Sequence, residues 1–420
     1  MQESLKLDMR KKDFRRLTAA WVVAAICAAA VVMPAPVQAQ QSGGWRQEVA
    51  EKAQAAQQAG QNGNYSEAIR LLKEAKSRGS LQPAEEQGVN ELLIWAASGA
   101  RDYGLLAATI EERLATGRVR GADQVNKLRT LADAYYSARD LRRASDATTR
   151  LIKARGTATP DDLILLGQLQ FQLKDFRAAA PTLEKAYQAA RRAGKPTRTQ
   201  VQVLEMLNAS YFELKDDGNR METLHQLIVV QPKTSVFDQI VGQYQREGYD
   251  AVGMVNLYRL GLRANVLSKE HYGKYADAAL DVSSPGEAVT MLEKGMTTGA
   301  IKKDNRNERL LADAKQQVAS LKANLGQQER EARAIADGDA DARLAAAYYT
   351  IGDWAKTLEV GKRAVQKGKL DRPDQVHMML GVTLMHLKKS AEAKTNFDAA
   401  ATANPNIKGV ANLWSDVAGG

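Results

Sequence analysis

The sequence predicts an all-α protein, built as a solenoid of stacked helical hairpins. Alanine is abundant among its 420 residues and only 6% are aromatic, a composition that favours helices over strands. A second observation is a pair, Asn or Asp followed by an apolar anchor, that recurs at steps of 32 to 41 residues, with one gap of 69 that corresponds to two periods. The clear copies are Asn64-Tyr65, Asp102-Tyr103, Asp140-Leu141, Asp175-Phe176 and Asp353-Trp354, and weaker copies place anchors at Asp217, Tyr249, Pro285 and Ser390. We therefore expect about 18 to 21 helices in a right-handed superhelix, and no β-sheet.

Each anchor has a recurring neighbourhood. A large apolar residue and a small one stand ten and nine positions before it, as in Leu166 and Gly167. A small residue, a bulky one and another small one follow at three, seven and ten positions, as in Ala179, Leu183 and Ala186. These offsets share one helical face, so the small residues let the two helices of a hairpin approach and the bulky ones fill the space. The Asn or Asp suits the turn and the N-cap of the second helix.

This pattern resembles the tetratricopeptide repeat, or TPR. The best copies run from Leu163 to Ala186 and from Leu380 to Pro405, and the resemblance covers about residues 47–300 and 338–418. It implies a TPR-type solenoid. Three residues depart from the pattern, because they stand where it expects other apolar or small side chains: Arg113, Thr148 and Gly361.

The first 39 residues have the features of a secretory signal peptide. Six Lys and Arg side chains precede an uncharged run from Leu17 to Met33, and the segment ends in Val37-Gln38-Ala39. This order is typical of a signal cleaved after Ala39. The alternative is a retained membrane anchor, for which the uncharged run has the minimal length of about 17 residues. Cleavage would remove the one cysteine, and an exported chain of this length without disulfides fits a bacterial periplasm.

The rest of the chain divides into four parts. We expect an N-terminal TPR-like array at 45–300, an irregular helical connector at 301–337, a C-terminal TPR pair at 338–406 and a capping helix at 407–418. In the connector, apolar residues recur at helical spacing up to Leu325, and we expect a long helix, a break at Gly326 and a short helix. A solenoid needs a terminal cap, and Trp414 lies on the apolar face of the last helix. After residue 39 the sequence contains no run of about 18 apolar residues, so we expect no membrane span in the mature chain.

Motifs for catalysis, metal binding or cofactor binding are absent from the sequence. None of His225, His271, His377 and His386 begins an H-E-x-x-H motif or has another histidine three or four positions away. Neither a P-loop nor a dinucleotide-binding glycine motif occurs. The net charge of +10 comes from 59 basic and 49 acidic residues without a basic run that contains clustered aromatics. We therefore expect a non-enzymatic protein with no metal, no cofactor and no nucleic-acid partner.

A second set of offsets marks a candidate binding surface. The residues that stand five positions before an anchor, and one residue a turn earlier, are Tyr136, Phe171, Phe212, Tyr244, Tyr349 and Trp95. In a TPR-like stack this offset faces the concave groove, where aromatic side chains can anchor a peptide or a partner helix. The alternative is core packing, because Tyr136, Phe212 and Tyr349 each follow another aromatic residue and one member of each pair must point elsewhere. Lys and Arg clamps for carboxylate tails are not supported, since the equivalent positions hold Arg129, Asp133, Ile164 and Gln168.

The C-terminal block adds a second resemblance. From Asp341 through Gly368-Lys369-Leu370 to Trp414, it is similar to the end of TPR proteins that accompany TonB–ExbB–ExbD systems. That resemblance implies an accessory role in TonB-dependent transport across the outer membrane. The sequence thus predicts a periplasmic scaffold that binds one or more envelope proteins or peptides. The alternative is a periplasmic chaperone or carrier that holds secreted or outer-membrane polypeptides in its groove.

Overall fold

The computed structural model describes residues 44–195 and 197–419, so the predicted signal peptide lies outside the described part. Within that part the chain forms twenty α-helices and one 3₁₀ turn and contains no β-strand, as the sequence predicts. None of the described helices is long and apolar enough to cross a membrane. The chain forms two compact units, which divide after Ala189, inside the array expected at 45–300. Each unit is described by itself.

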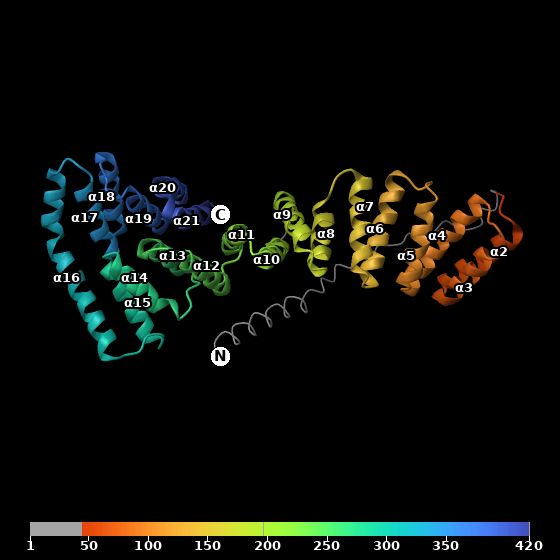
Figure 1. Ribbon diagram of the computed structural model, residues 1–420, viewed down its shortest axis with the longest axis horizontal. Coiled ribbons are helices and arrows are strands. Elements are labelled where there is room, and N and C mark those ends of the chain that lie inside the picture. Colours follow the sequence, from red (N-terminus) through yellow and green to blue (C-terminus); the bar gives the residue numbers. More distant parts are fainter. Residues whose placement is uncertain (1–43, 196, 420) are drawn as a thin grey trace. The chain divides into compact units, whose positions relative to one another are not determined.

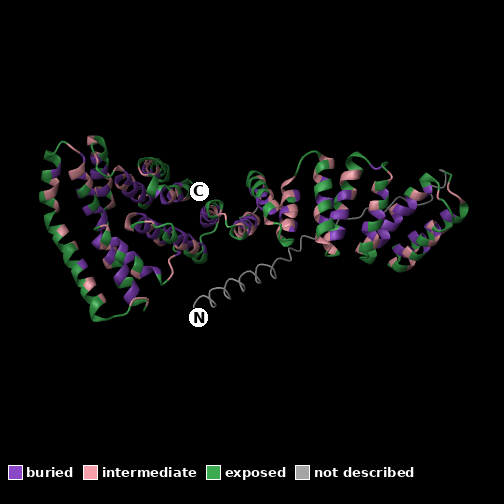
Figure 2. Ribbon diagram, in the orientation of Figure 1, coloured by how far each residue is buried: buried purple, intermediate pink, exposed green. Residues whose placement is uncertain are grey.

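The N-terminal unit is a row of helical hairpins in which each helix packs against the next one along the chain (Figure 1). Its helices are α2 (Gln47–Gln61), α3 (Tyr65–Lys76), α4 (Pro83–Ala100), α5 (Tyr103–Ala115), α6 (Gly121–Ser137), α7 (Leu141–Arg155), α8 (Pro160–Gln172) and α9 (Phe176–Arg192), whose last turn passes the division. Buried leucine, alanine and aromatic side chains fill the space between the helices. Figure 2 shows the buried positions on the faces where helices meet and the exposed positions on the opposite faces.

The Asn and Asp of the repeated pair act as N-caps, as expected. The side chain of Asp102 accepts a hydrogen bond from the Leu105 amide at 3.0 Å, and Asp140 accepts one from Arg143 at 3.1 Å. The residue before each cap has a left-handed backbone, with φ of 56° at Arg101 and 61° at Arg139. The cap satisfies an amide that the first helical turn leaves free, and therefore fixes where each second helix begins.

The small residues of the repeat mark close helix–helix contacts. A Cβ atom on Gly167 would lie 2.7 Å from Leu183 Cδ2, and one on Gly381 would lie 2.4 Å from Phe397 Cε1. These distances are shorter than van der Waals contact, so the helices of both hairpins can meet only around a residue without a side chain.

The three departures from the repeat are all accommodated in the structure. Arg113 is 5% exposed, and its Nε lies 3.5 Å from an oxygen of Glu91. Thr148 is fully buried and donates its hydroxyl to the Ala144 carbonyl at 2.8 Å. A Cβ on Gly361 would lie 2.7 Å from a Leu380 methyl group, so this position also serves a close contact.

The C-terminal unit begins as a second row of hairpins and then reverses direction (Figure 1). Its helices are α10 (Thr197–Leu214), α11 (Asp217–Val230), α12 (Thr234–Arg246), α13 (Ala251–Arg263), α14 (His271–Asp281), α15 (Pro285–Thr297), α16 (Asn305–Ala334), α17 (Asp339–Thr350), α18 (Trp354–Lys367), α19 (Pro373–His386), α20 (Ser390–Ala403), the 3₁₀ turn η3 (Pro405–Ile407) and α21 (Lys408–Gly419). The 30-residue helix α16 leads the chain from α15 to α17.

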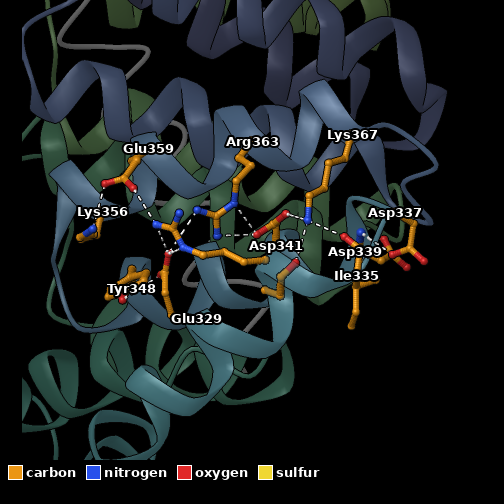
Figure 3. A network of polar contacts seen from close by, with 12 residues as sticks. Glu329, Ile335, Asp337, Asp339, Asp341, Tyr348, Lys356, Glu359, Arg363 and Lys367 are labelled. Carbon is orange, nitrogen blue, oxygen red and sulfur yellow. Dashed lines mark hydrogen bonds and ion pairs between the residues drawn. The ribbon is translucent and has the colours of Figure 1, made fainter.

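The expected break in the connector was wrong. Helix α16 continues through Gly326 to Ala334, because a single glycine in an exposed helix costs only about 1 kcal/mol and does not end it. A polar network fixes the end of α16 to the C-terminal repeats (Figure 3). Arg363 bonds to Glu329 at 3.2 Å and to the buried Asp341 at 2.8 Å, and Lys367 donates to the Ala332 carbonyl at 2.7 Å.

The last helix returns to the first half of the unit. Helix α21 packs on α20, as a cap would, and also on α11 and α13. Trp414 is fully buried, and its indole N–H donates to the Asn256 carbonyl of α13 at 2.9 Å. Helix α21 therefore closes the C-terminal unit as well as capping it.

Candidate functional site

The N-terminal unit carries two of the predicted aromatic residues on neighbouring helices. Tyr136 of α6 and Phe171 of α8 are half-buried. Gln168 of α8 donates to the Tyr136 hydroxyl at 3.3 Å, and the Phe171 ring meets the Phe176 ring edge-on at 5.6 Å. Both rings are held in place by such contacts and still expose part of their surface to solvent.

Trp95 has a different environment. It is 8% exposed and packs over Gly60, where a Cβ would lie 2.4 Å from the indole, and its ring meets Tyr65 edge-on at 5.7 Å. Trp95 is therefore a core residue of the first two hairpins, and its expected place in the groove was wrong.

Phe212 of the C-terminal unit is 45% exposed, and the Arg220 guanidinium lies 5.0 Å above its ring. Its neighbour Tyr211 is 6% exposed. The same division occurs at Tyr135 and Tyr136, so in these two pairs one member packs inside and the other faces outward, because consecutive helical residues point in different directions.

Tyr244 and Tyr349 are both in the core, with exposures of 1% and 4%. The Tyr244 hydroxyl lies 2.9 Å from Nε2 of the buried His225, and the Arg259 guanidinium lies 4.6 Å above the Tyr349 ring. The groove assignment of these two residues was therefore wrong. Their faces are covered because the unit folds back on itself, so helices far apart in the sequence bury positions that a simple array would leave open.

A buried ion pair lies where α13, α14, α15 and α17 meet, a place called the junction below. Arg259 of α13 donates from Nε to Glu287 of α15 at 2.9 Å, and Tyr275 and Ser284 donate to the same carboxylate at 2.8 and 2.7 Å. Burial by itself would raise the pKa of Glu287, but the Arg259 charge and these hydrogen bonds outweigh it and hold that pKa below its ordinary value. Thr350 of α17 completes the junction, since its hydroxyl accepts from the Gly286 amide at 2.9 Å.

A cavity of about 290 Å³ lies beside the junction, in the C-terminal unit. Helices α13, α17 and α19 line it, together with the turn after α14 and the loop before α19. Its wall includes the predicted groove residue Tyr349 and residues that the sequence had not singled out, among them Asp339 and Asp371. Local spacing holds no signal for it, because its walls come from segments up to 127 positions apart (Val252 to Met379).

Arg129 and Asp133, at the positions of a carboxylate clamp, form no such clamp. Arg129 pairs with Asp162 of α8 at 3.1 Å, and Asp133 carries the wrong charge for a carboxylate ligand. Across residues 44–195 and 197–419, no group of three or more His, Cys, Asp or Glu side chains is arranged to hold a metal ion.

Two segments of the chain match the family model for the tetratricopeptide repeat, residues 163–192 and 374–407. The first is the hairpin of α8 and α9, and the second is the hairpin of α19 and α20 with η3. These matches and the hairpin geometry define the fold as a TPR-type helical array. No curated protein matches the chain.

Several solved structures are similar to the chain at low sequence identity. A tetratricopeptide repeat protein from Parabacteroides merdae is 13% identical, with a TM-score of 0.28, over 69% of this chain and 98% of that one. Yeast Tom70 is 12% identical, with a TM-score of 0.23, over 88% and 95%. A structure of Naa15/Naa10 bound to HypK is 17% identical, with a TM-score of 0.38, over 86% of this chain and 54% of that one, so the chain spans about half the length of that structure.

Proposed function

We propose that this protein is a non-enzymatic scaffold that binds another protein through the N-terminal unit. The main evidence is the pair Tyr136 and Phe171. They lie on the first helices of successive hairpins, and part of each ring is exposed to solvent. Partly exposed aromatic rings that are held by neighbours bind a partner at low entropic cost, because few rotamers are lost. The matched repeat at residues 163–192 contains one of the two rings.

The location that we propose is the bacterial periplasm. The support is the sequence of residues 1–39, with its basic start, uncharged centre and Val37-Gln38-Ala39 ending. Exported protein should then begin at Gln40, and N-terminal sequencing that found Met1 would instead support a retained anchor.

The finer proposal is an accessory role in TonB-dependent outer-membrane transport. Its support is the similarity of the C-terminal block to TPR proteins that accompany TonB–ExbB–ExbD systems, on residues such as Gly368-Lys369-Leu370. The alternative is a chaperone or carrier, which would bind many different envelope polypeptides through the same two aromatic rings.

Site-specific photocrosslinking tests the scaffold and separates it from the alternative. A benzophenone amino acid replaces Tyr136 or Phe171 in cells, and in a control it replaces Arg142, which is exposed on α7. One crosslinked partner from positions 136 and 171, absent at 142, supports the scaffold. A ladder of many clients supports the chaperone, and equal crosslinking at all three positions contradicts the proposed surface.

A further inference from the structure

The cavity of the C-terminal unit has an apolar floor and a charged mouth. Its volume of about 290 Å³ lies just below the range for small-ligand sites, about 300–1,000 Å³. The floor is formed by the buried side chains Val255, Tyr349, Val376 and Met379. Ala346 of α17 lines the cavity and is exposed, so a methyl group stands where a larger side chain would fill the space. The floor therefore suits an apolar group.

Two of the three arginines on the cavity wall are already neutralised. Arg259 forms its bidentate pair with Glu287, and its Nη1 donates to Asn256 at 2.8 Å. Arg372 donates from Nε and Nη2 to Asp374 at 3.2 and 3.1 Å. Each guanidinium has its own carboxylate, so neither leaves a positive charge for a ligand.

Two carboxylates at the mouth, those of Asp339 and Asp371, have no bidentate arginine partner of this kind. Asp371, in the loop before α19, donates its amide to Asp339 Oδ1 of α17 at 3.0 Å. The interaction between the two neighbouring carboxyl groups raises the pKa of Asp371 and lowers the pKa of Asp339. The third arginine, Arg343, approaches Asp339 no closer than 3.8 Å, and its side chain is 74% exposed. The mouth therefore carries an excess of negative charge.

We propose that this cavity is a binding site for an organic cation, with the apolar body on the floor and one ammonium or guanidinium group on Asp339 and Asp371. The N–H groups of the cation would donate to oxygens of both carboxylates, and its positive charge would offset their negative charge. An anion would meet the like charge of the pair. A neutral apolar molecule would fill the floor and leave the carboxylates unpaired.

The same chemistry has two sources, a free amine or a lysine or arginine side chain of a partner polypeptide. This site is separate from the surface around Tyr136 and Phe171, and it does not depend on the proposed scaffold. Its failure would leave that proposal intact.

Three probes of similar shape and different charge test the site by isothermal titration against the purified protein. They are 2-phenylethylammonium, 2-phenylethanol and phenylacetate. We expect the ammonium ion to bind at least about tenfold more tightly than the alcohol, and the acid anion more weakly than the alcohol. Equal binding of cation and alcohol, or no binding of the cation, would overturn the proposal.

Variants assign the binding to the cavity. Asp339→Asn with Asp371→Asn keeps the shape and removes the charge, so the preference for the cation should disappear. Ala346→Phe should fill the cavity and abolish binding of all three probes. Asp313→Asn removes one negative charge from the exposed face of α16, outside the cavity, and should leave binding unchanged. Unchanged cation preference in the double variant would refute the site.

The double variant retains the hydrogen-bonding geometry, so it remains informative if Ala346→Phe fails to fold, which circular dichroism would detect. A capped peptide that contains Phe-Lys separates the two sources. Tighter binding of the peptide than of 2-phenylethylammonium indicates a polypeptide source, and tighter binding of the amine indicates a free amine.

Discussion

Replacement of Trp414 by alanine should open the C-terminal unit. The indole is fully buried, stacks on Phe397 with ring centres 5.2 Å apart, and donates to the Asn256 carbonyl. Loss of a buried Trp side chain typically costs about 3–5 kcal/mol. The lost hydrogen bond adds about 0.5–1.5 kcal/mol, and little more, because a carbonyl inside α13 also accepts its helical hydrogen bond. We therefore expect a total loss of about 4–6 kcal/mol.

Urea unfolding followed by circular dichroism measures this loss. Because the chain has two compact units, only the transition of the C-terminal unit should move. Trp414→Phe keeps the stack and loses the donor, so it should cost about 1–2 kcal/mol. Trp354→Ala is the matched control. Trp354 begins α18, is half-buried and stacks on His386 of α19, so its loss removes a Trp ring from the same unit but not from α21.

Hydrogen exchange decides whether α21 is more than a cap. If it closes the unit, Trp414→Ala should increase amide exchange in α11 and α13, which α21 contacts. If it only caps the row, faster exchange would be confined to α19 and α20. Unchanged exchange in α11 and α13, with a cost no larger than that of Trp354→Ala, would refute the closure.

Two further predictions concern packing and pH. Gly167→Leu should lower the free energy of unfolding by about 1–3 kcal/mol, because the new side chain would enter the contact with Leu183. The control Gly326→Leu, on exposed α16, should be neutral or stabilising by up to about 1 kcal/mol. Equal shifts of the melting temperature in the two variants would contradict this. Burial lowers the pKa of His225 to about 4, so the folded chain favours the neutral imidazole. The stability that this histidine contributes above pH 6.5 should therefore be lost as the pH falls towards 4, and the loss should reach roughly 3 kcal/mol. The urea midpoint between pH 4 and 7 should depend less on pH in His225→Gln, and an identical slope in both proteins would disprove the assignment.

The helical hairpins were predictable because their causes are local. Helical faces repeat every three to four residues, so the small and bulky offsets around Gly167 and Leu183 define which faces meet. The caps are local too, since Asp102 bonds to an amide three residues later. Within the adjacent pairs, the sequence left open which of Tyr135 and Tyr136 faces outward, because a one-residue error of register exchanges them.

The candidate site was only partly predictable. Tyr136, Phe171 and Phe212 keep exposed surface, but Tyr244 and Tyr349 are buried by helices from the other half of the C-terminal unit. Their offsets in the repeat are the same. What differs is the fold around them, which a repeat offset does not encode.

The sequence by itself determined the helical class, the period, the caps and the close contacts within hairpins. Only the tertiary structure decided that Trp414 meets Asn256 across 158 positions and that a cavity forms between α13 and α17. The physical reason is range. Hairpins are specified by neighbours three, four and seven positions away, whereas the closure and its cavity depend on how small rotations between successive hairpins accumulate, and no short stretch of sequence records their sum.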